Sequence, residues 1–211
     1  MRFAPLFALF LSGTALAADA TKPHDHQGIV AAYTGAPPPV ALSAEDLGKL
    51  AAGELVTKQV QRGNGGHGVA FQDIKATPDT IWARINNHAM YPSWVNGVKS
   101  CQDYKKEGAH VWTAFGLSVL GVNVDYFINH TFVPAQNYLT WTLDYTRQSD
   151  LDDSVGYWRI IPLSTTPVLT RVEYSVDIRF KGWIPGFAQD FIANKGLTDA
   201  VSWVKKQSEA G

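Results

Sequence analysis

The 211-residue sequence has very little cysteine, and its opposite charges nearly cancel. Its one cysteine, Cys101, cannot form an intramolecular disulfide or a cysteine-rich metal site, so the fold must be held by packing. The formal net charge of −1 provides no basic excess, which argues against nucleic acid as a partner. Because only 18% of the residues are charged and 45% are hydrophobic, the chain has enough apolar material for one core and is not globally disordered.

The sequence also lacks the common catalytic and metal-binding motifs. It contains no G-x-S-x-G, H-E-x-x-H or P-loop pattern. Residues 63–68 match G-x-G-x-x-G, but a strand-like pattern follows instead of the helix that would bind a pyrophosphate, so we interpret them as a turn between strands. His24-Asp25-His26 has no third ligand nearby in the sequence and is expected to be part of a solvated tail. We therefore predict no cofactor and no metal.

The first 17 residues have the features of a cleavable signal peptide. Arg2 precedes an apolar run from Leu6 to Leu11, which is shorter than the roughly 20 residues of a membrane-spanning helix. Ala15-Leu16-Ala17 then forms a small-x-small cleavage site. We expect cleavage after Ala17 and a periplasmic or secreted product. Residues 18–41 are rich in proline and have no hydrophobic period, so they are predicted to be an extended or disordered lead segment.

Two helix starts and a long series of strands follow this lead segment. Residues 42–65 are predicted to form a leader of helix and strand, in which Ser43 is the N-cap of a short helix that ends at Gly53. Thr77-Pro78 predicts the start of a second helix. Alternating patterns separated by turn residues predict antiparallel strands at 98–105, 109–119, 122–133, 138–147, 154–162 and 168–180. In the last strand the even positions are mostly apolar and the odd positions polar, so we expect the odd face to meet water.

The final segment has apolar residues at roughly helical spacing. These residues are Phe187, Phe191, Leu197, Val201 and Val204. They predict a C-terminal amphipathic helix across the concave face of the sheet. Gly196 lies inside the pattern and lowers helix propensity by about 1 kcal/mol relative to alanine, so a break is expected there.

An ordered set of segments resembles a known superfamily. The segments are 76–82 (ATPDTIW), 91–98 (YPSWVNGV), 156–158 (GYW), 170–174 (TRVEY) and Ile184-Pro185. Together they are similar to the START-related, or SRPBCC, superfamily, which includes lipid-transfer domains and polyketide cyclase/dehydratase-like proteins. The resemblance implies an α+β helix-grip fold over residues 66–207. In this fold a curved antiparallel sheet of about seven strands wraps around a long C-terminal helix, with two short helices after the first strand.

The resemblance further implies a cavity between sheet and C-terminal helix that takes a hydrophobic small molecule or lipid. The sequence has 25 aromatic residues, and its strand pattern supplies candidates for the cavity wall. The predicted ligand-binding residues are Trp112, Phe115, Tyr126, Ile128, Trp141, Leu143, Trp158, Tyr174, Val176, Phe187 and Phe191. The competing interpretation is that they fill a dry core.

Three classes of function remain open at this stage. A carrier is favoured over a cyclase or hydrolase and over a partner-binding module whose cavity has filled. His130, Asp125 and Asp144 are the strand residues that an enzyme would use, although an ordinary hydrogen-bonded role is favoured for each. Transient contact with a membrane or transporter is a further expectation. The sequence names neither the ligand nor the oligomeric state.

Overall fold

A computed structural model describes residues 18–119, 121–182 and 196–210. The strands are β1 (Val56–Gln61), β2 (Gly65–Ile74), β3 (Val98–Glu107), β4 (His110–Val119), β5 (Val122–Val133), β6 (Tyr138–Leu143), β7 (Leu151–Thr165) and β8 (Val168–Phe180). The helices are α1 (Ala44–Ala51), α2 (Pro78–Ile85), α3 (Tyr91–Trp94) and α5 (Leu197–Glu209), with 3-10 turns η1 (His88–Met90) and η2 (Pro134–Gln136). Among these described helices, none is long and apolar enough to cross a membrane.

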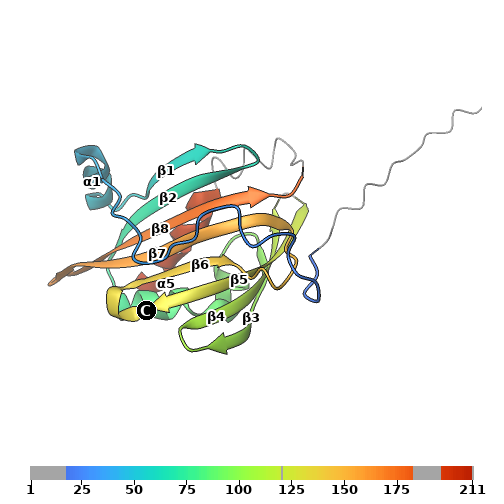
Figure 1. Cartoon of the computed structure of the whole chain (residues 1–211). Helices are drawn as coiled ribbons and strands as arrows, with labels where there is room; N and C mark the ends of the chain where they lie inside the picture. The colour runs from blue at the N-terminus through green and yellow to red at the C-terminus, as the bar shows by residue number, and fades with distance from the viewer. Residues whose placement is uncertain (1–17, 120, 183–195, 211) are drawn as a thin grey trace, which may run out of the picture.

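All eight strands form one curved antiparallel sheet in the order β1-β2-β8-β7-β6-β5-β4-β3. Figure 1 shows the sheet with α5 behind it, which confirms the α+β helix-grip arrangement. The expected number of strands was about seven, and the additional strand is β1. It comes from the predicted leader and pairs with β2 from Val56 to Gln61.

The predicted helix starts are confirmed at atomic detail. The Ser43 hydroxyl accepts from the Asp46 N–H, and the Asp46 carboxylate accepts from the Ser43 N–H, which is a capping box. Thr77 caps α2 in the same way by accepting from the Thr80 N–H, with Pro78 at the first helical position. Gly53 follows α1 with φ +81°, a conformation that glycine adopts without strain.

Ser43→Ala is expected to lower the free energy of unfolding by about 1 kcal/mol, because an N-terminal amide of α1 then loses its acceptor. Ser43→Asp, which restores an acceptor, should recover most of this loss. Urea unfolding followed by circular dichroism measures both changes. Equal losses in the two variants would show that the cap does not stabilise α1.

The main core lies between the inner, concave face of the sheet and the helices. Leu197, Val201 and Val204 of α5 are buried against it, as their spacing predicted. Ile81 and Ile85 of α2 join the same cluster. The final helix is described from Leu197, directly after Gly196. A smaller cluster on the outer face packs α1 against β1 and β2.

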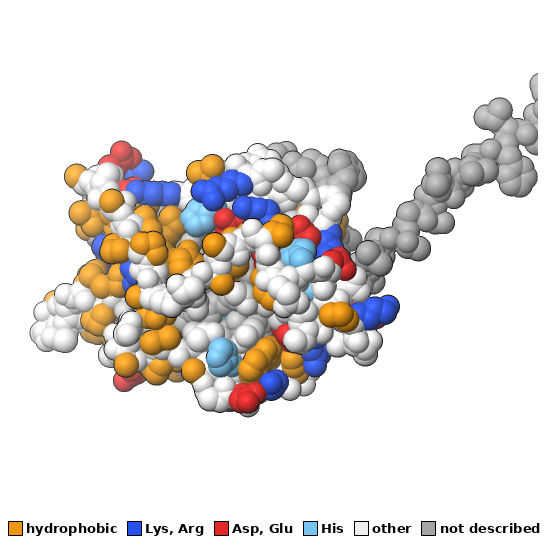
Figure 2. Space-filling model, in the orientation of Figure 1, with side chains coloured by type: hydrophobic (Ala, Val, Ile, Leu, Met, Phe, Trp, Pro, Cys, Tyr) orange, Lys and Arg blue, Asp and Glu red, His pale blue; other side chains and the backbone are white. Residues whose placement is uncertain are grey.

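Residues 18–41, here called the strap, cross the outer face of the sheet. Figure 1 shows the strap in blue in front of β7 and β8, opposite α5. Figure 2 shows the same face in space-filling form, with Lys and Arg side chains near β1 and β2. The strap is therefore extended and packed. The expectation that His24-Asp25-His26 is solvated was wrong for His24, whose exposed fraction is 4%.

The strap covers the odd-numbered side of β8, which we expected to face water. Glu173 on this side is 2% exposed, and it accepts a hydrogen bond of 2.5 Å from the Tyr157 hydroxyl. Arg159 lies 3.5 Å from the same carboxylate and also donates to the Pro37 carbonyl of the strap. Tyr33 of the strap packs edge-on against Tyr157. Glu173 is buried on this side because Tyr157 and Arg159 are its partners there.

Candidate functional site: the aromatic wall of the inner face

Five aromatic side chains from β4 to β8 lie on the inner face of the sheet, because side chains alternate between the two faces of a strand. We call them the aromatic wall: Phe115, Tyr126, Trp141, Trp158 and Tyr174. Phe115 stacks on Tyr126 with ring centroids 5.1 Å apart, and Trp141 stacks on Tyr174 at 5.5 Å. Trp158 lies 4.5 Å from Tyr174 at a tilted angle. These contacts link the rings in two adjoining groups.

Burial differs along the wall. Trp141 and Trp158 are buried, whereas Phe115, Tyr126 and Tyr174 keep part of their surface accessible although they belong to the inner face. Val176, next to Tyr174 on the same side of β8, is also half-buried. The described side chains therefore leave part of this wall uncovered.

Two tyrosine hydroxyls provide polar groups in this apolar surface. Burial raises the pKa of Tyr126 and of Tyr174, so both remain protonated at neutral pH. Among the residues that the structure describes, no group forms a hydrogen bond with either hydroxyl. Each is thus free to donate to or accept from a bound molecule.

A polar cluster borders the wall at the end formed by β3, β4 and β5. His88 Nδ1 lies 2.6 Å from Asp103 Oδ1, and the Thr113 hydroxyl donates to the same oxygen at 2.7 Å. His130 stacks on His88 at 5.1 Å and lies within 3.4 Å of Thr113 Oγ1. Burial lowers the pKa of His130 to about 3, so its imidazole is neutral at physiological pH. The ring of His130 also contacts Phe115 and Trp141 of the wall.

Most of the predicted wall residues share the inner face. Ile128, Leu143 and Val176 lie there beside the aromatic wall and belong to the main core or pack against it. Phe187 and Phe191 fall outside the described residues. For the residues on the inner face, contact with a ligand remains a prediction.

The prediction that Trp112 lines the cavity wall was wrong, because Trp112 lies on the outer face. Its ring stacks on His110, and Lys105 Nζ lies 4.2 Å from its centroid. Trp112 and Phe115 are three residues apart in β4, and positions separated by an odd number in a regular strand point to opposite faces. Only one of them could therefore line the inner face.

Asp125 and Asp144 lie away from the aromatic wall. Asp144 is buried on the outer side, where it accepts hydrogen bonds from the Tyr104 hydroxyl and from Thr146. Asp125 borders a pocket of about 350 Å³ that is also lined by Ala18 of the strap and by Phe115. Of the three candidates for catalysis, only His130 contacts the wall.

The sequence contains no pattern that connects His88, Asp103 and Thr113. They come from η1, β3 and β4, so no fixed spacing connects them, and only the sheet pairing brings Asp103 opposite Thr113. The pattern of alternation places Thr113 on the side of Phe115, but it does not locate His88.

Comparison with known proteins supports the fold. Residues 74–202 match the family model described as polyketide cyclase / dehydrase and lipid transport. Among solved structures, the chain is similar to a START superfamily protein from Mycobacterium smegmatis, with 19% identity, a TM-score of 0.54, and 74% of this chain and 97% of the other covered. A comparison with curated protein sequences gives no match.

Two further structures show the same fold at lower identity. A STAR-related lipid transfer protein from Xanthomonas axonopodis has 13% identity and a TM-score of 0.58, covering 72% of this chain and 90% of the other. The Zhui aromatase/cyclase from Streptomyces sp. R1128 has 12% identity and the same TM-score, covering 73% and 94%. At these identities the likeness concerns the fold alone.

Proposed function

We propose that this chain binds a hydrophobic small molecule or lipid at the aromatic wall. The chain belongs to the polyketide cyclase / dehydrase and lipid transport family, and the proposal proceeds from that membership. The observation that carries the proposal is the incomplete burial of Phe115, Tyr126 and Tyr174 on the inner face. Apolar surface left accessible in the interior of a fold is stabilised when an apolar ligand covers it.

The two unpaired tyrosine hydroxyls define which ligands fit. A molecule with an apolar body and a hydroxyl, carbonyl or carboxyl group satisfies Tyr126 or Tyr174 while its body covers the rings. A pure hydrocarbon would leave the hydroxyls without partners. We therefore propose a mostly apolar ligand with one or a few polar groups.

The carrier is proposed to act outside the cytoplasm. The support is the sequence of residues 1–17, with its short apolar run and the Ala15-Leu16-Ala17 site. Intact-mass measurement on the protein recovered from the periplasm is expected to give a chain that starts at Ala18. A full-length mass in the membrane fraction would contradict export.

Tyr174→Leu and Tyr126→Leu are expected to weaken binding of a fluorescent fatty-acid analogue about tenfold, because each removes a ring face and a hydroxyl from the wall. Trp112→Leu is the matched control: it removes an aromatic ring from the outer face and should leave the affinity unchanged. Fluorescence titration measures all three dissociation constants. Equal affinities across the set, or no binding by the wild type of either this analogue or a sterol analogue, would contradict the proposal.

The His88–Asp103 pair favours a second candidate, an enzyme acting on the same kind of ligand. An imidazole held by a carboxylate at 2.6 Å, beside an apolar wall, is an arrangement that general base catalysis uses. His88→Asn and Asp103→Asn would then abolish turnover of a bound substrate while leaving its dissociation constant within about twofold. Native mass spectrometry of the protein purified from its own cells, with identification of any adduct, supplies the substrate to test. An unchanged adduct after long incubation favours the carrier.

A further inference from the structure

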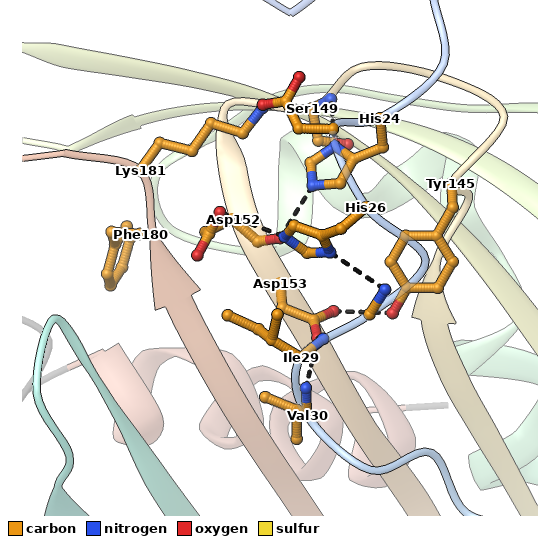
Figure 3. A network of polar contacts seen from close by, with 12 residues as sticks. His24, His26, Ile29, Val30, Tyr145, Ser149, Asp152, Asp153, Phe180 and Lys181 are labelled. Carbon is orange, nitrogen blue, oxygen red and sulfur yellow. Dashed lines mark hydrogen bonds and ion pairs between the residues drawn. The ribbon is translucent and has the colours of Figure 1, made fainter.

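Two histidines of the strap meet one strand of the sheet at a single point. His24 Nε2 lies 2.8 Å from the backbone oxygen of Asp152 in β7, and His26 Nε2 lies 3.3 Å from Asp152 Oδ1. Figure 3 shows both rings next to this residue, between Tyr145 and Lys181. The two imidazoles are edge to face, with centroids 4.8 Å apart.

The other ring nitrogens decide what this cluster can bind. His24 Nδ1 accepts from the Ser149 N–H at 3.3 Å, and His26 Nδ1 accepts from the Gly28 N–H at 3.0 Å. A backbone amide always donates, so both Nδ1 atoms are unprotonated and both protons are on Nε2. A metal held by Nε2 would need the proton on Nδ1, facing these amides, whereas a metal-bound histidine normally donates there to an acceptor. The geometry therefore favours a role for the imidazole of His24 itself.

We propose that His24 is a proton-operated latch, which holds the strap on the outer face when the imidazole is neutral and releases it when the imidazole is protonated. A second proton has only Nδ1 to bind, where it would point at the Ser149 N–H. His24 is 4% exposed and Ser149 0%, so water cannot separate the two donors without opening the contact. Once Nδ1 carries a proton, the ring must leave the site.

Charged and titratable groups surround His24 on three sides. They are Asp25 and His26 of the strap, Asp152 and Asp153 of β7, Tyr145 after β6, and Lys181 after β8. Lys181, which forms an ion pair of 2.8 Å with Asp25, lowers the pKa of His24 more than Asp25 raises it. The Asp153 carboxylate accepts hydrogen bonds from the strap amides of Ile29 and Val30.

The sign of the pH dependence follows from the burial of His24. Burial holds its pKa below the ordinary value of 6.5. The docked state favours the neutral form of His24, so His24 contributes fully to docking above pH 6.5. This contribution is lost as the pH falls from 6.5 toward the lowered pKa of the docked state. The strap should thus be docked at pH 7.5 and loosened near pH 5.

Hydrogen exchange of the full mature chain tests the latch. The amides of His24, Ile29 and Val30 donate to Tyr145 or Asp153 when the strap is docked. Corrected for intrinsic exchange rates, their protection should fall about tenfold between pH 7.5 and pH 5.0, because protonation of His24 opposes docking. Amides in the middle of β7 and β8 should keep their protection, which shows that the domain remains folded.

Variants separate His24 from other causes. His24→Asn keeps an acceptor near the Ser149 N–H but does not titrate, so its strap protection should be the same at both pH values. His67→Asn is the matched control, because His67 borders the strap in another pocket and its pKa is also lowered by burial. It should retain the wild-type loss of protection at pH 5.0.

Three results would overturn the latch. The first is wild-type protection of the strap that does not change with pH, and the second is a pH response that persists in His24→Asn. The third is strap protection that rises on addition of Zn²⁺ at pH 7.5 in the wild type but not in His24→Asn, because the cluster would then be a metal site. Each result leaves the proposal on ligand binding at the opposite face untouched.

Discussion

Gly156→Ala is expected to lower the free energy of unfolding by about 3 kcal/mol, because the added methyl group would overfill a tightly packed point of β7. A Cβ atom at Gly156 would lie 2.6 Å from Cη2 of Trp141 and even closer to the carbonyl oxygen of Ser175. The backbone oxygen cannot move without disturbing the pairing of β7 with β8. Trp141 is buried, and interiors are close-packed, so moving its ring also costs free energy.

Chemical denaturation of Gly156→Ala against wild type measures this loss. Gly48→Ala in α1 is the control, since a Cβ there meets no atom within 4 Å and alanine is the better helix former. It should leave stability unchanged or raise it by up to about 1 kcal/mol. A loss under 1 kcal/mol for Gly156→Ala would mean that Trp141 is not held where the structure has it.

Asp153→Asn is expected to cost about 2 to 3 kcal/mol, because one buried carboxylate fixes both the strap and β7. Its Oδ2 accepts from the amides of Ile29 and Val30, both at 2.7 Å, and its Oδ1 accepts from the Tyr145 hydroxyl at 2.8 Å. Figure 3 shows these contacts next to the histidines. An asparagine has only one accepting oxygen, so its NH₂ group must face a donor on one side.

The neighbouring Asp152→Asn provides a matched control for the same chemical change. The Asp152 side chain makes a single contact of 3.3 Å with His26 and is one-third exposed, so a loss below about 1 kcal/mol is expected. Urea unfolding gives both values, and hydrogen exchange shows whether the strap is released. Similar losses at both positions would contradict the special role of Asp153.

Local signals in the sequence predicted the secondary structure well, because they depend on neighbours along the chain. Ser43 and Thr77 cap helices since their hydroxyls reach amides three residues away. The alternation in β8 likewise separates Tyr174 from Glu173 correctly. Such patterns establish which residues share a face of a strand.

The sequence could not show what covers each face. Polar residues such as Glu173 suggested a solvated surface, yet their partners come from β7, and the strap, more than 100 residues earlier in the chain, lies over them. His24 was assigned to a tail for the same reason, as its partners Ser149 and Asp152 lie far away in sequence. Long-range contacts of this kind leave no periodic signal. The position of Trp112, by contrast, was open to prediction from its odd spacing to Phe115.

Strand β7 carries residues of both the aromatic wall and the surface under the strap, on alternate positions. Tyr157 and Arg159 lie under the strap, whereas Gly156 and Trp158 belong to the side of the aromatic wall. Neighbouring residues of β7 therefore face opposite sides of the sheet. A shift of this strand would move the residues under the strap and those beside the aromatic wall together. Thermodynamic linkage is reciprocal: if docking of the strap strengthens ligand binding by some factor, a bound ligand must strengthen docking by the same factor. Binding of a ligand at the inner face would then change how strongly the strap is docked on the outer face.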